Sequence, residues 1–452
     1  MERFLVRNFG CRASQADGAA IETALSGKGL SQVGEVSEAQ LIVLNTCTVT
    51  STADEDVRQA VRRVYRENPT ARILVTGCYA QRAPDEIAGM PGVHWVVGNS
   101  HKTRIAEIVG DPAAGEPAAG KPAAGETAAG VVPYHGLVNL GNIMVGDIFA
   151  QREFLAAPVI DAAGDRTRPN LKIQDGCGNR CSFCIIPFVR GRSRSMEADR
   201  VIAEIRNLAE RYREVVLSGI NLGRWGREPG STWRLADLLR RILEETAMER
   251  IRLSSVEPMD FSDDLLGLMA GEPRIAKHVH APLQSGADTV LRRMHRKYRP
   301  RHYEDRIRKA RALMPDAAIG ADVMVGFPGE TAGEFEQSRQ FIASLPFTYL
   351  HVFTYSERPG TQAADCPDQV PVAVRKERNR VLRELAAGKN LAFRRAMVGR
   401  TLSVVTLEQG ALSDNFLKVE LAAPRAANRL LDVRIGAVTA GGLREQAALM
   451  VL

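Results

Sequence analysis

Three cysteines within one short loop, Cys177, Cys181 and Cys184, are the residues of this chain best suited to metal chemistry. A closed zinc site or a four-cysteine iron–sulfur cluster needs four ligands, and no fourth cysteine lies nearby. Three thiolates on one loop suit a [4Fe–4S] cube that leaves one iron open to bind a small molecule. A zinc knuckle completed by a distant histidine, or three unrelated thiols, are the alternatives.

A second set of cysteines, Cys11, Cys47 and Cys78, follows short apolar runs that predict buried parallel strands. A helical pattern comes after each run, so this part of the chain predicts an open α/β sheet. Ligands of such sheets collect beyond the carboxyl ends of the strands, where we expect all three cysteines. Together they could hold a second [4Fe–4S] cluster, and buried structural cysteines are the alternative. Cys366 lies in a polar stretch and is interpreted as an incidental thiol.

The composition is typical of a soluble globular protein, with 45% hydrophobic and 25% charged residues among 452. No apolar stretch is long enough to cross a membrane, and the charged N-terminus lacks the apolar segment of a signal peptide. We therefore expect a cytoplasmic protein without a membrane partner, whose thiols stay reduced. The formal charge of +7 is compatible with a polyanionic partner.

The length and the patterns along the chain predict an α/β protein of several domains. An open parallel α/β domain is expected over 1–105, followed by a linker over 106–165. The linker contains a pentapeptide repeat of small residues at 111–130, which offers too little apolar surface to pack. Six strand–helix units over 166–397 predict a parallel sheet curved into a partial (β/α)6 barrel. The period-two pattern of 398–452 predicts a small antiparallel β-barrel.

Short motifs around both cysteine sets resemble one family. They read Gly-Cys-Arg at 10–12, Asn-Thr-Cys-Thr-Val-Thr at 45–50, Thr-Gly-Cys-Tyr-Ala-Gln at 76–81, and the cluster loop 175–187. Together these segments resemble the radical S-adenosylmethionine (SAM) methylthiotransferases. The resemblance implies an N-terminal domain with an auxiliary cluster, a central radical-SAM barrel and a C-terminal TRAM domain, a nucleic-acid-binding fold.

The resemblance also implies the cofactors and the reaction. Two [4Fe–4S] clusters and SAM are expected, with SAM bound to the open iron of the central loop. In this family one electron from that cluster cleaves SAM to a 5′-deoxyadenosyl radical, which takes a hydrogen atom from the substrate. The auxiliary cluster carries a sulfur that a first SAM molecule methylates, so that a methylthio group replaces the hydrogen. The six cysteines of both sets are then catalytic and metal-binding residues.

The family has three branches, two of which act on tRNA, and the segments 45–54, 77–81 and 351–361 look most like the threonylcarbamoyladenosine branch. Its substrate is N6-threonylcarbamoyladenosine, whose C2 receives the methylthio group at position 37. The alternatives are isopentenyladenosine at position 37 of tRNA and an aspartate of a ribosomal protein. A non-catalytic iron–sulfur protein that binds RNA or senses redox state is a further alternative. The expected partners are the tRNA anticodon loop and an electron donor such as flavodoxin or ferredoxin, and we expect a monomer.

Polar and small residues at the predicted strand ends of the barrel are candidates to bind SAM. Each taken alone is also explained by loop capping, and the repetition of such residues around one rim favours a shared ligand. The candidates are Phe183, Ser218, Gly219, Asn221, Ser255, Glu257, Gln284, Asp322 and Gly326.

Basic residues follow the cluster loop and the fourth barrel strand, and one lies in the C-terminal segment. A solvated charged face is the ordinary explanation of such runs, whereas their position beside the predicted active-site rim favours phosphate contact. The candidates for nucleic-acid contact are Arg190, Arg192, Arg194, Arg293, Arg296, Lys297 and Lys418. Phe188, Tyr298 and Tyr303 lie among them and are candidates to stack on a base.

Overall fold

The computed structural model describes residues 1–110, 138–140, 143–155 and 167–447. The repeat at 111–130 lies outside the described residues, so its predicted character is not tested. The described residues form two compact units. The first comprises those of 1–159, 175–194 and 356–365, and the second comprises the remainder. The cluster loop therefore belongs to the same unit as the N-terminal cysteines, whereas the sequence analysis placed it within a separate barrel domain over 166–397. The predicted domain boundaries themselves stay a prediction.

The first unit is built around a seven-stranded sheet of order β2-β1-β3-β4-β5-β7-β6. The pairs from β2 to β7 are parallel, and only the edge strand β6 runs antiparallel to its neighbour. The strands are β1 Arg3–Asn8, β2 Ser31–Gln32, β3 Leu41–Thr46, β4 Arg72–Gly77, β5 Val93–Gly98, β6 Val138–Leu140 and β7 Ile143–Val145. The helices are α1 Arg12–Gly27, α2 Ser51–Glu67, α3 Cys78–Arg82, α4 Pro84–Ala88, α5 Ile105–Gly110 and α6 Ile186–Arg190.

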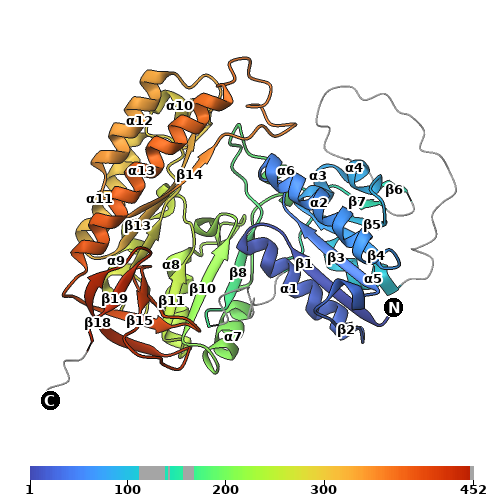
Figure 1. Cartoon of the computed structure of the whole chain (residues 1–452), viewed down its shortest axis with the longest axis horizontal. Coiled ribbons are helices and arrows are strands. Elements are labelled where there is room, and N and C mark those ends of the chain that lie inside the picture. Colours follow the sequence, from blue (N-terminus) through green and yellow to red (C-terminus); the bar gives the residue numbers. More distant parts are fainter. Residues whose placement is uncertain (111–137, 141–142, 156–166, 448–452) are drawn as a thin grey trace. The chain divides into compact units, whose positions relative to one another are not determined.

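Alternating residues of the central strands make this sheet apolar on both faces. Ile42 and Leu44 of β3 join a core with Val57 and Val61 of α2, while Leu41 and Val43 of β3 join a core that contains Ile21 of α1. Both faces are thus covered by helices, as a buried parallel sheet requires (Figure 1). The predicted α/β class is confirmed for this part of the chain.

In its described residues, the second unit contains seven strands in two sheets, β11-β10-β8-β9 and β12-β13-β14. All of them except β9 are joined by parallel pairing. A parallel bridge between Ile251 and Ile275 connects the two sheets, so the strands form an open, partial barrel. The strands are β8 Asn170–Asp175, β9 Arg194–Ser195, β10 Glu214–Gly219, β11 Arg250–Leu253, β12 His278–His280, β13 Ala318–Val325 and β14 Tyr349–Thr354. The helices are α7 Ala198–Ala209, α8 Leu235–Glu245, α9 Asp263–Gly271, α10 Asp288–Arg293, α11 Pro300–Leu313, α12 Ala332–Ser344 and α13 Val372–Ala396. The alternation of strands and helices that the sequence predicts is confirmed.

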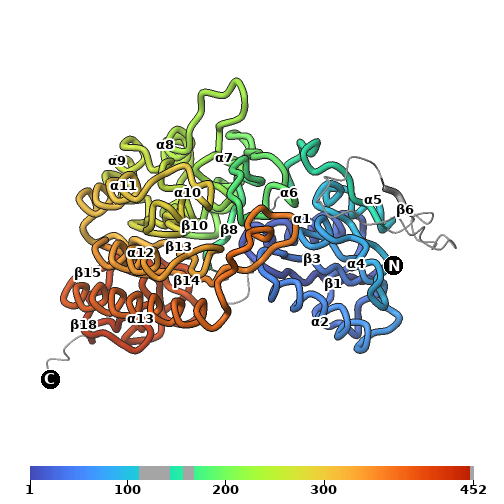
Figure 2. The backbone as a smooth tube through the Cα atoms, turned by 90° about the horizontal axis from the view of Figure 1, so that it is seen from above, coloured from blue at the N-terminus to red at the C-terminus, as the bar shows by residue number. Residues whose placement is uncertain are grey.

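Helix α13 runs along β14 and reaches the C-terminal barrel (Figure 2). That barrel is closed in the order β15-β16-β17-β19-β18. Its strands are β15 Thr401–Thr406, β16 Ala411–Ser413, β17 Lys418–Glu420, β18 Leu430–Val438 and β19 Leu443–Glu445. All pairs are antiparallel except β17 with β19, so the predicted small barrel is present with one parallel pair.

A buried arginine joins this barrel to the larger sheet. Arg252 of β11 pairs with Glu214 of β10 at 2.7 Å and donates to the carbonyl oxygens of Ser413 and Asp414. Nearby, Phe416 stacks on His278 of β12 with 4.4 Å between ring centroids. None of the helices in the described part of the chain combines the length and the hydropathy needed to cross a bilayer.

Candidate active site

The three N-terminal cysteines lie at one edge of the first unit's sheet. Cys11 is the N-cap of α1 just beyond β1, Cys47 directly follows β3, and Cys78 begins α3 directly after β4. Strands β1, β3 and β4 are neighbours in parallel register, with Asn8 opposite Asn45. Because the carboxyl ends of parallel strands share an edge, this topology brings the three cysteines of the predicted second set together.

Glycines before two of these cysteines permit the close approach. Gly10 has φ +106°, and a Cβ there would lie 2.6 Å from Cβ of Cys47. Gly77 has φ +101°, and a Cβ there would lie 2.4 Å from the carbonyl oxygen of Thr46. The left-handed backbone and the lack of space both require glycine, which is why Cys11 and Cys78 follow glycine rather than another small residue.

The thiols also influence one another electrostatically. Burial raises the pKa of Cys47 to about 12, and the neighbouring Cys78 and then Cys11 add to the shift. Such a site disfavours bare thiolates, and bound iron would reverse this because a metal cation deprotonates coordinating thiols. Three converging sulfur donors with no fourth cysteine beside them fit a [4Fe–4S] cluster with one open iron. All seven cysteines lie in described residues, and none forms a disulfide.

The cluster loop is held by its own backbone. The amide of Cys177 donates to the carbonyl of Gly191 at 3.0 Å, and the amide of Cys184 donates to that of Cys181 at 3.1 Å. The amide of Asn179 points at Sγ of Cys177, 3.4 Å away, and amide donors to sulfur stabilise a thiolate ligand. The three cysteines and Phe183 are partly exposed, so this loop fits a cluster that a small molecule can reach.

Within the same unit, the cluster loop packs onto the N-terminal sheet edge. Cys78 belongs to an apolar cluster with Ile185 and Val189, the former being the residue that follows Cys184. The side-chain amide of Asn99 donates to the carbonyl of Val189 at 2.6 Å and points at Sγ of Cys78, 3.5 Å away. The two cysteine sets are therefore neighbours, although they are far apart in the sequence.

A buried network of charges connects the loop with α1. Asp17 accepts from Lys102 at 2.9 Å and from Arg190 at 3.0 Å, and Arg190 also donates to Asp175 at 2.9 Å. Burial lowers the pKa of Lys102, although Asp17 opposes the shift. Arg190 is 2% exposed, so its burial counts against the predicted contact with nucleic acid and makes it a positioning residue. Sequence analysis missed Asp17 and Lys102, which carry no local motif.

The segment 356–365 contacts both cysteine loops within this unit. Arg358 is buried, pairs with Asp54 at 2.7 Å and donates to the carbonyl of Thr48, the residue after Cys47. The amide of Ala363 donates to the carbonyl of Ser182, which lies inside the cluster loop. The segment thus holds the backbone next to one ligand of each set, a role that the sequence motif at 351–361 did not reveal.

The glycine at the start of the cluster loop gives a direct prediction. Gly176 has φ +69°, and a Cβ there would lie 2.0 Å from the carbonyl oxygen of Arg192. We expect Gly176→Ala to cost about 1–3 kcal/mol in backbone strain, with the steric clash in addition, and to lower iron content and SAM cleavage. Gly178→Ala is the control, since nothing lies within 4 Å of a Cβ at that position. Equal iron content in the two variants would contradict this account of the loop.

In the second unit, three SAM candidates lie together at the carboxyl end of β10. Ser218 is buried, and its hydroxyl has no hydrogen-bond partner among the described residues. The amide of Asn221 donates to Oε1 of Gln174 at 2.7 Å, and a Cβ on Gly219 would lie 2.8 Å from that same oxygen. The orphaned hydroxyl and the glycine, which leaves the backbone uncovered at the end of β10, fit a place where a polar ligand approaches the backbone.

The other candidates at the ends of β11 to β13 already have intramolecular partners. Ser255 hydrogen-bonds Nδ1 of His280 at 2.7 Å, and Glu257 pairs with Arg296. Gln284 has φ +65°, and its backbone amide donates to the carbonyl of Asp322. Gly326 has φ +72°, and its amide donates to Glu330 at 2.7 Å. The left-handed backbone therefore explains this glycine without a bound ligand.

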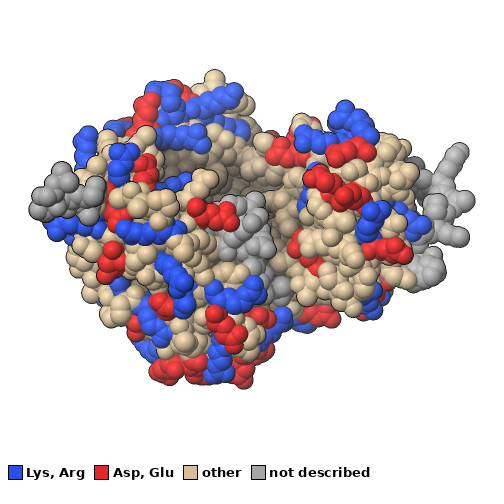
Figure 3. Space-filling model, turned by 60° about the horizontal axis from the view of Figure 1, so that its bottom comes forward, with Lys and Arg blue, Asp and Glu red and all other residues tan. Residues whose placement is uncertain are grey.

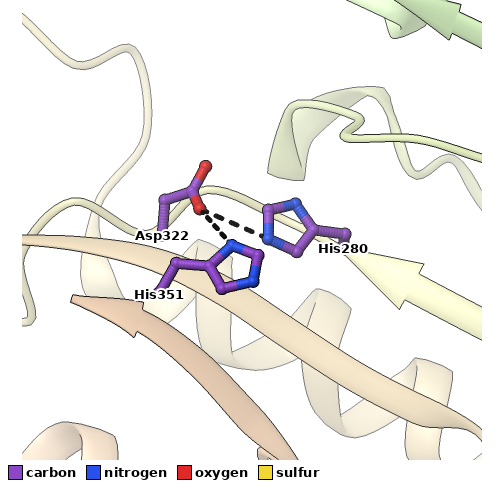
Figure 4. Close-up of side chains that lie close together, drawn as sticks. All are labelled: His280, Asp322 and His351. Atoms are coloured by element: carbon purple, nitrogen blue, oxygen red, sulfur yellow. Dashed lines mark hydrogen bonds and ion pairs between the residues drawn. The ribbon is translucent and has the colours of Figure 1, made fainter. Parts of the chain in front are cut away.

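Asp322 lies between two imidazoles (Figure 4). Its Oδ1 accepts from Nδ1 of His351 at 3.1 Å and lies 3.4 Å from Nε2 of His280. Burial alone would raise the pKa of Asp322, but the two imidazoles outweigh burial and hold that pKa well below its usual range. Because its carboxylate is engaged in this way, we do not retain Asp322 among the proposed SAM contacts.

The basic candidates differ in their exposure. Arg192, Lys297 and Lys418 are exposed. Arg194 is largely buried, Arg293 pairs with Glu334 at 2.9 Å, and Arg296 is buried against Glu257. Tyr298 and Tyr303 are also buried, with their hydroxyls bonded to backbone carbonyls, so their rings cannot stack on a base, whereas Phe188 is partly exposed. On the face in Figure 3, basic and acidic side chains are interspersed.

Comparison with known proteins agrees with this geometry. Residues 171–342 match the family model described as the radical SAM superfamily, and residues 3–98 match the model described as uncharacterized protein family UPF0004. The radical SAM methyltransferase TsrM from Kitasatospora setae has a similar fold, with a TM-score of 0.55 and 15% identity over 80% of this chain and 77% of that one. Fold and sequence together define a radical-SAM protein with an additional N-terminal α/β domain.

Curated relatives define the family more closely. The threonylcarbamoyladenosine tRNA methylthiotransferase MtaB of Aquifex aeolicus is 32% identical over 94% of this chain and 98% of its own length. The MtaB protein of Bacillus subtilis is 38% identical over 85% of this chain and 79% of its own length. The tRNA-2-methylthio-N(6)-dimethylallyladenosine synthase of Syntrophobacter fumaroxidans is 33% identical over 86% and 82%. The chain belongs to the radical-SAM tRNA methylthiotransferase family, whose members use SAM and [4Fe–4S] clusters.

Proposed function

We propose that this protein adds a methylthio group to C2 of N6-threonylcarbamoyladenosine at position 37 of tRNA. The observation that supports the reaction is the pairing of two three-cysteine sets within one unit, with Cys78 packed against the residue that follows Cys184. The observation that supports the substrate is the similarity to MtaB proteins over nearly the whole chain. The related dimethylallyladenosine synthases favour isopentenyladenosine as the second candidate substrate.

In this proposal each cysteine set holds one cluster, with one iron open in each. Cys177, Cys181 and Cys184 are the ligands of the cluster that binds SAM, and Cys11, Cys47 and Cys78 are the ligands of the auxiliary cluster. The cofactors supply radical hydrogen abstraction and the transferable sulfur. The protein supplies placement, because Arg190, Asn99 and the segment 356–365 hold the two loops against each other.

The proposed SAM contacts are Phe183 of the cluster loop and the rim residues whose backbone or side chains remain suited to a ligand. Ser218 leads this group because its buried hydroxyl lacks a partner within the described residues. The remaining proposed contacts are Gly219, Asn221, Ser255, Glu257, Gln284 and Gly326. We propose the cytoplasm as the place of action, since tRNA is found there and thiols stay reduced, with flavodoxin or ferredoxin as electron donor and a monomeric enzyme.

A gene deletion tests the proposed substrate. Nucleosides from tRNA of the deletion strain, separated by chromatography and identified by mass spectrometry, should contain threonylcarbamoyladenosine without its methylthio derivative. Methylthio-isopentenyladenosine should be unchanged in the same sample, which is the internal control. If the isopentenyl derivative disappeared instead, the second candidate substrate would be the correct one.

The exposed lysines give a prediction for tRNA binding. Lys418 on β17 is exposed on the C-terminal barrel, and we expect Lys418→Ala to weaken tRNA binding and to reduce the slope of log affinity against log salt by about 1, because one phosphate contact is lost. Lys28→Ala, a change of the same charge beyond the end of α1, serves as the control. Equal slopes for both variants and the unchanged protein would exclude Lys418 from the interface.

A further inference from the structure

Three side chains of the second unit converge, and hydrogen bonds do not account for all of their buried polar atoms. His280, Asp322 and His351 come from the adjacent strands β12, β13 and β14. Asp322 is paired directly with His351, and His280 is paired with Gly320, two residues before Asp322. Since residues two apart along a strand face the same side of a sheet, the three side chains meet on one face, as Figure 4 shows.

The atoms that converge are those that bind metals. One nitrogen of each histidine and one carboxylate oxygen all lie within 4.8 Å of one another. Both nitrogens point at the same oxygen of Asp322, and only the His351 nitrogen makes a hydrogen bond to it. Nε2 of His280 is buried and has no hydrogen-bond partner among the described residues. Nε2 of His280 lies 3.4 Å from that oxygen, at ion-pair distance but without a hydrogen bond, and a bound ion beside both groups would explain this buried, incompletely satisfied nitrogen.

The surroundings hold both rings in position for such a ligand. Nδ1 of His280 is hydrogen-bonded to the hydroxyl of Ser255 at 2.7 Å, which fixes the ring and leaves Nε2 as the coordinating atom, the usual arrangement around a metal-bound histidine. Tyr349 packs beside both rings, 5.8 Å from His280 and 5.4 Å from His351 between centroids. Gly320 makes room for it, because a Cβ there would lie 2.0 Å from the tyrosine ring.

We propose that His280, Asp322 and His351 form a binding site for a divalent transition-metal ion. Two imidazoles and one carboxylate are a donor set shared by zinc and non-haem iron(II) sites. The His351 side chain is 53% exposed, so a metal bound there is reached by solvent on that side and completes its coordination with water or an anionic oxygen ligand. The site includes none of the six cysteines of the two sets and does not depend on the identity of the tRNA nucleoside.

Zinc is the probe that tests the site, because it is distinguished from cluster iron by elemental analysis. The holoenzyme, reconstituted anaerobically, is incubated with one equivalent of zinc, desalted and analysed for both metals. We expect one zinc per chain besides the cluster iron. Zinc X-ray absorption should show only nitrogen and oxygen neighbours at about 2.0–2.1 Å, and not sulfur at about 2.3 Å.

Variants assign the zinc to these residues. His351→Ala and Asp322→Asn should lose zinc at least tenfold while iron content stays unchanged, and Ser255→Ala should weaken zinc affinity about 10–100-fold by releasing the His280 ring. His302→Ala, which removes an exposed histidine of α11, should retain the full zinc content. Unchanged iron content shows that a variant is folded, so loss of zinc with full retention of iron supports the site. Absence of retained zinc in the parent, equal zinc in all variants, or sulfur neighbours in the absorption spectrum would each overturn the proposal.

Discussion

Replacing Cys11, Cys47 and Cys78 together by alanine should lower iron content from about eight to about four per chain and abolish methylthio transfer. Cleavage of SAM to 5′-deoxyadenosine should continue, because the central loop has its three cysteines close in sequence and its own backbone hydrogen bonds. Iron analysis and chromatography of 5′-deoxyadenosine and of tRNA nucleosides measure the three quantities in one preparation.

The seventh cysteine supplies the matched control for this experiment. Cys366 lies outside both sets, and Cys366→Ala should retain all iron and full methylthio transfer. If the three N-terminal cysteines were only packing residues, the triple variant would lose stability yet still make product. Methylthiolated tRNA formed by a soluble, folded triple variant would therefore remove the second cluster from the reaction.

The second large effect is expected at Asp17, which accepts from the buried cations Lys102 and Arg190. Asp17→Asn leaves both cations buried without a counter-charge from α1, and removing one partner of a buried ion pair costs about 3–5 kcal/mol. For a unit of this size we expect Tm to fall by roughly 6–20 °C, together with loss of iron from the loosened cluster loop.

Thermal unfolding followed by circular dichroism, with iron analysis before the scan, measures both effects. Asp56→Asn removes the same charge from an exposed position of α2 and should leave Tm within about 2 °C, since surface substitutions change stability by about 0.5 kcal/mol or less. An Asp17→Asn protein with the parent Tm and full iron content would show that the network does not hold the loop.

The sequence predicts where the cysteines lie because each one directly follows a local pattern, the apolar run of a strand. The apolar runs before Cys47 and Cys78 are the strands β3 and β4, which end at the residue before each cysteine, and parallel strands put the following residues at one edge. The role of Arg190 is not local. Its partner Asp17 is 173 residues away in the sequence. The basic run after the cluster loop therefore predicts a phosphate-binding surface, whereas the structure shows that Arg190 is buried.

The same limit applies to the second unit. The strands that carry His280, Asp322 and His351 are predicted correctly, but their register is set by tertiary pairing, and a shift of one residue would turn each side chain to the other face. Tyr298 and Tyr303 are adjacent to exposed basic residues in the sequence, yet both are buried, with their hydroxyls bonded to carbonyls of residues 281–283 just after β12. The burial of these two side chains is therefore visible only in the structure.

The most direct test of the account is a single-turnover assay with reconstituted enzyme, SAM, a chemical reductant and tRNA that carries threonylcarbamoyladenosine at position 37. Nucleosides released from the tRNA are identified by mass spectrometry, and 5′-deoxyadenosine and S-adenosylhomocysteine are measured in the same reaction. The account predicts the methylthio derivative, with one molecule of each SAM product for every nucleoside modified. Unmodified threonylcarbamoyladenosine, beside full conversion of a matched tRNA that carries isopentenyladenosine, would contradict it.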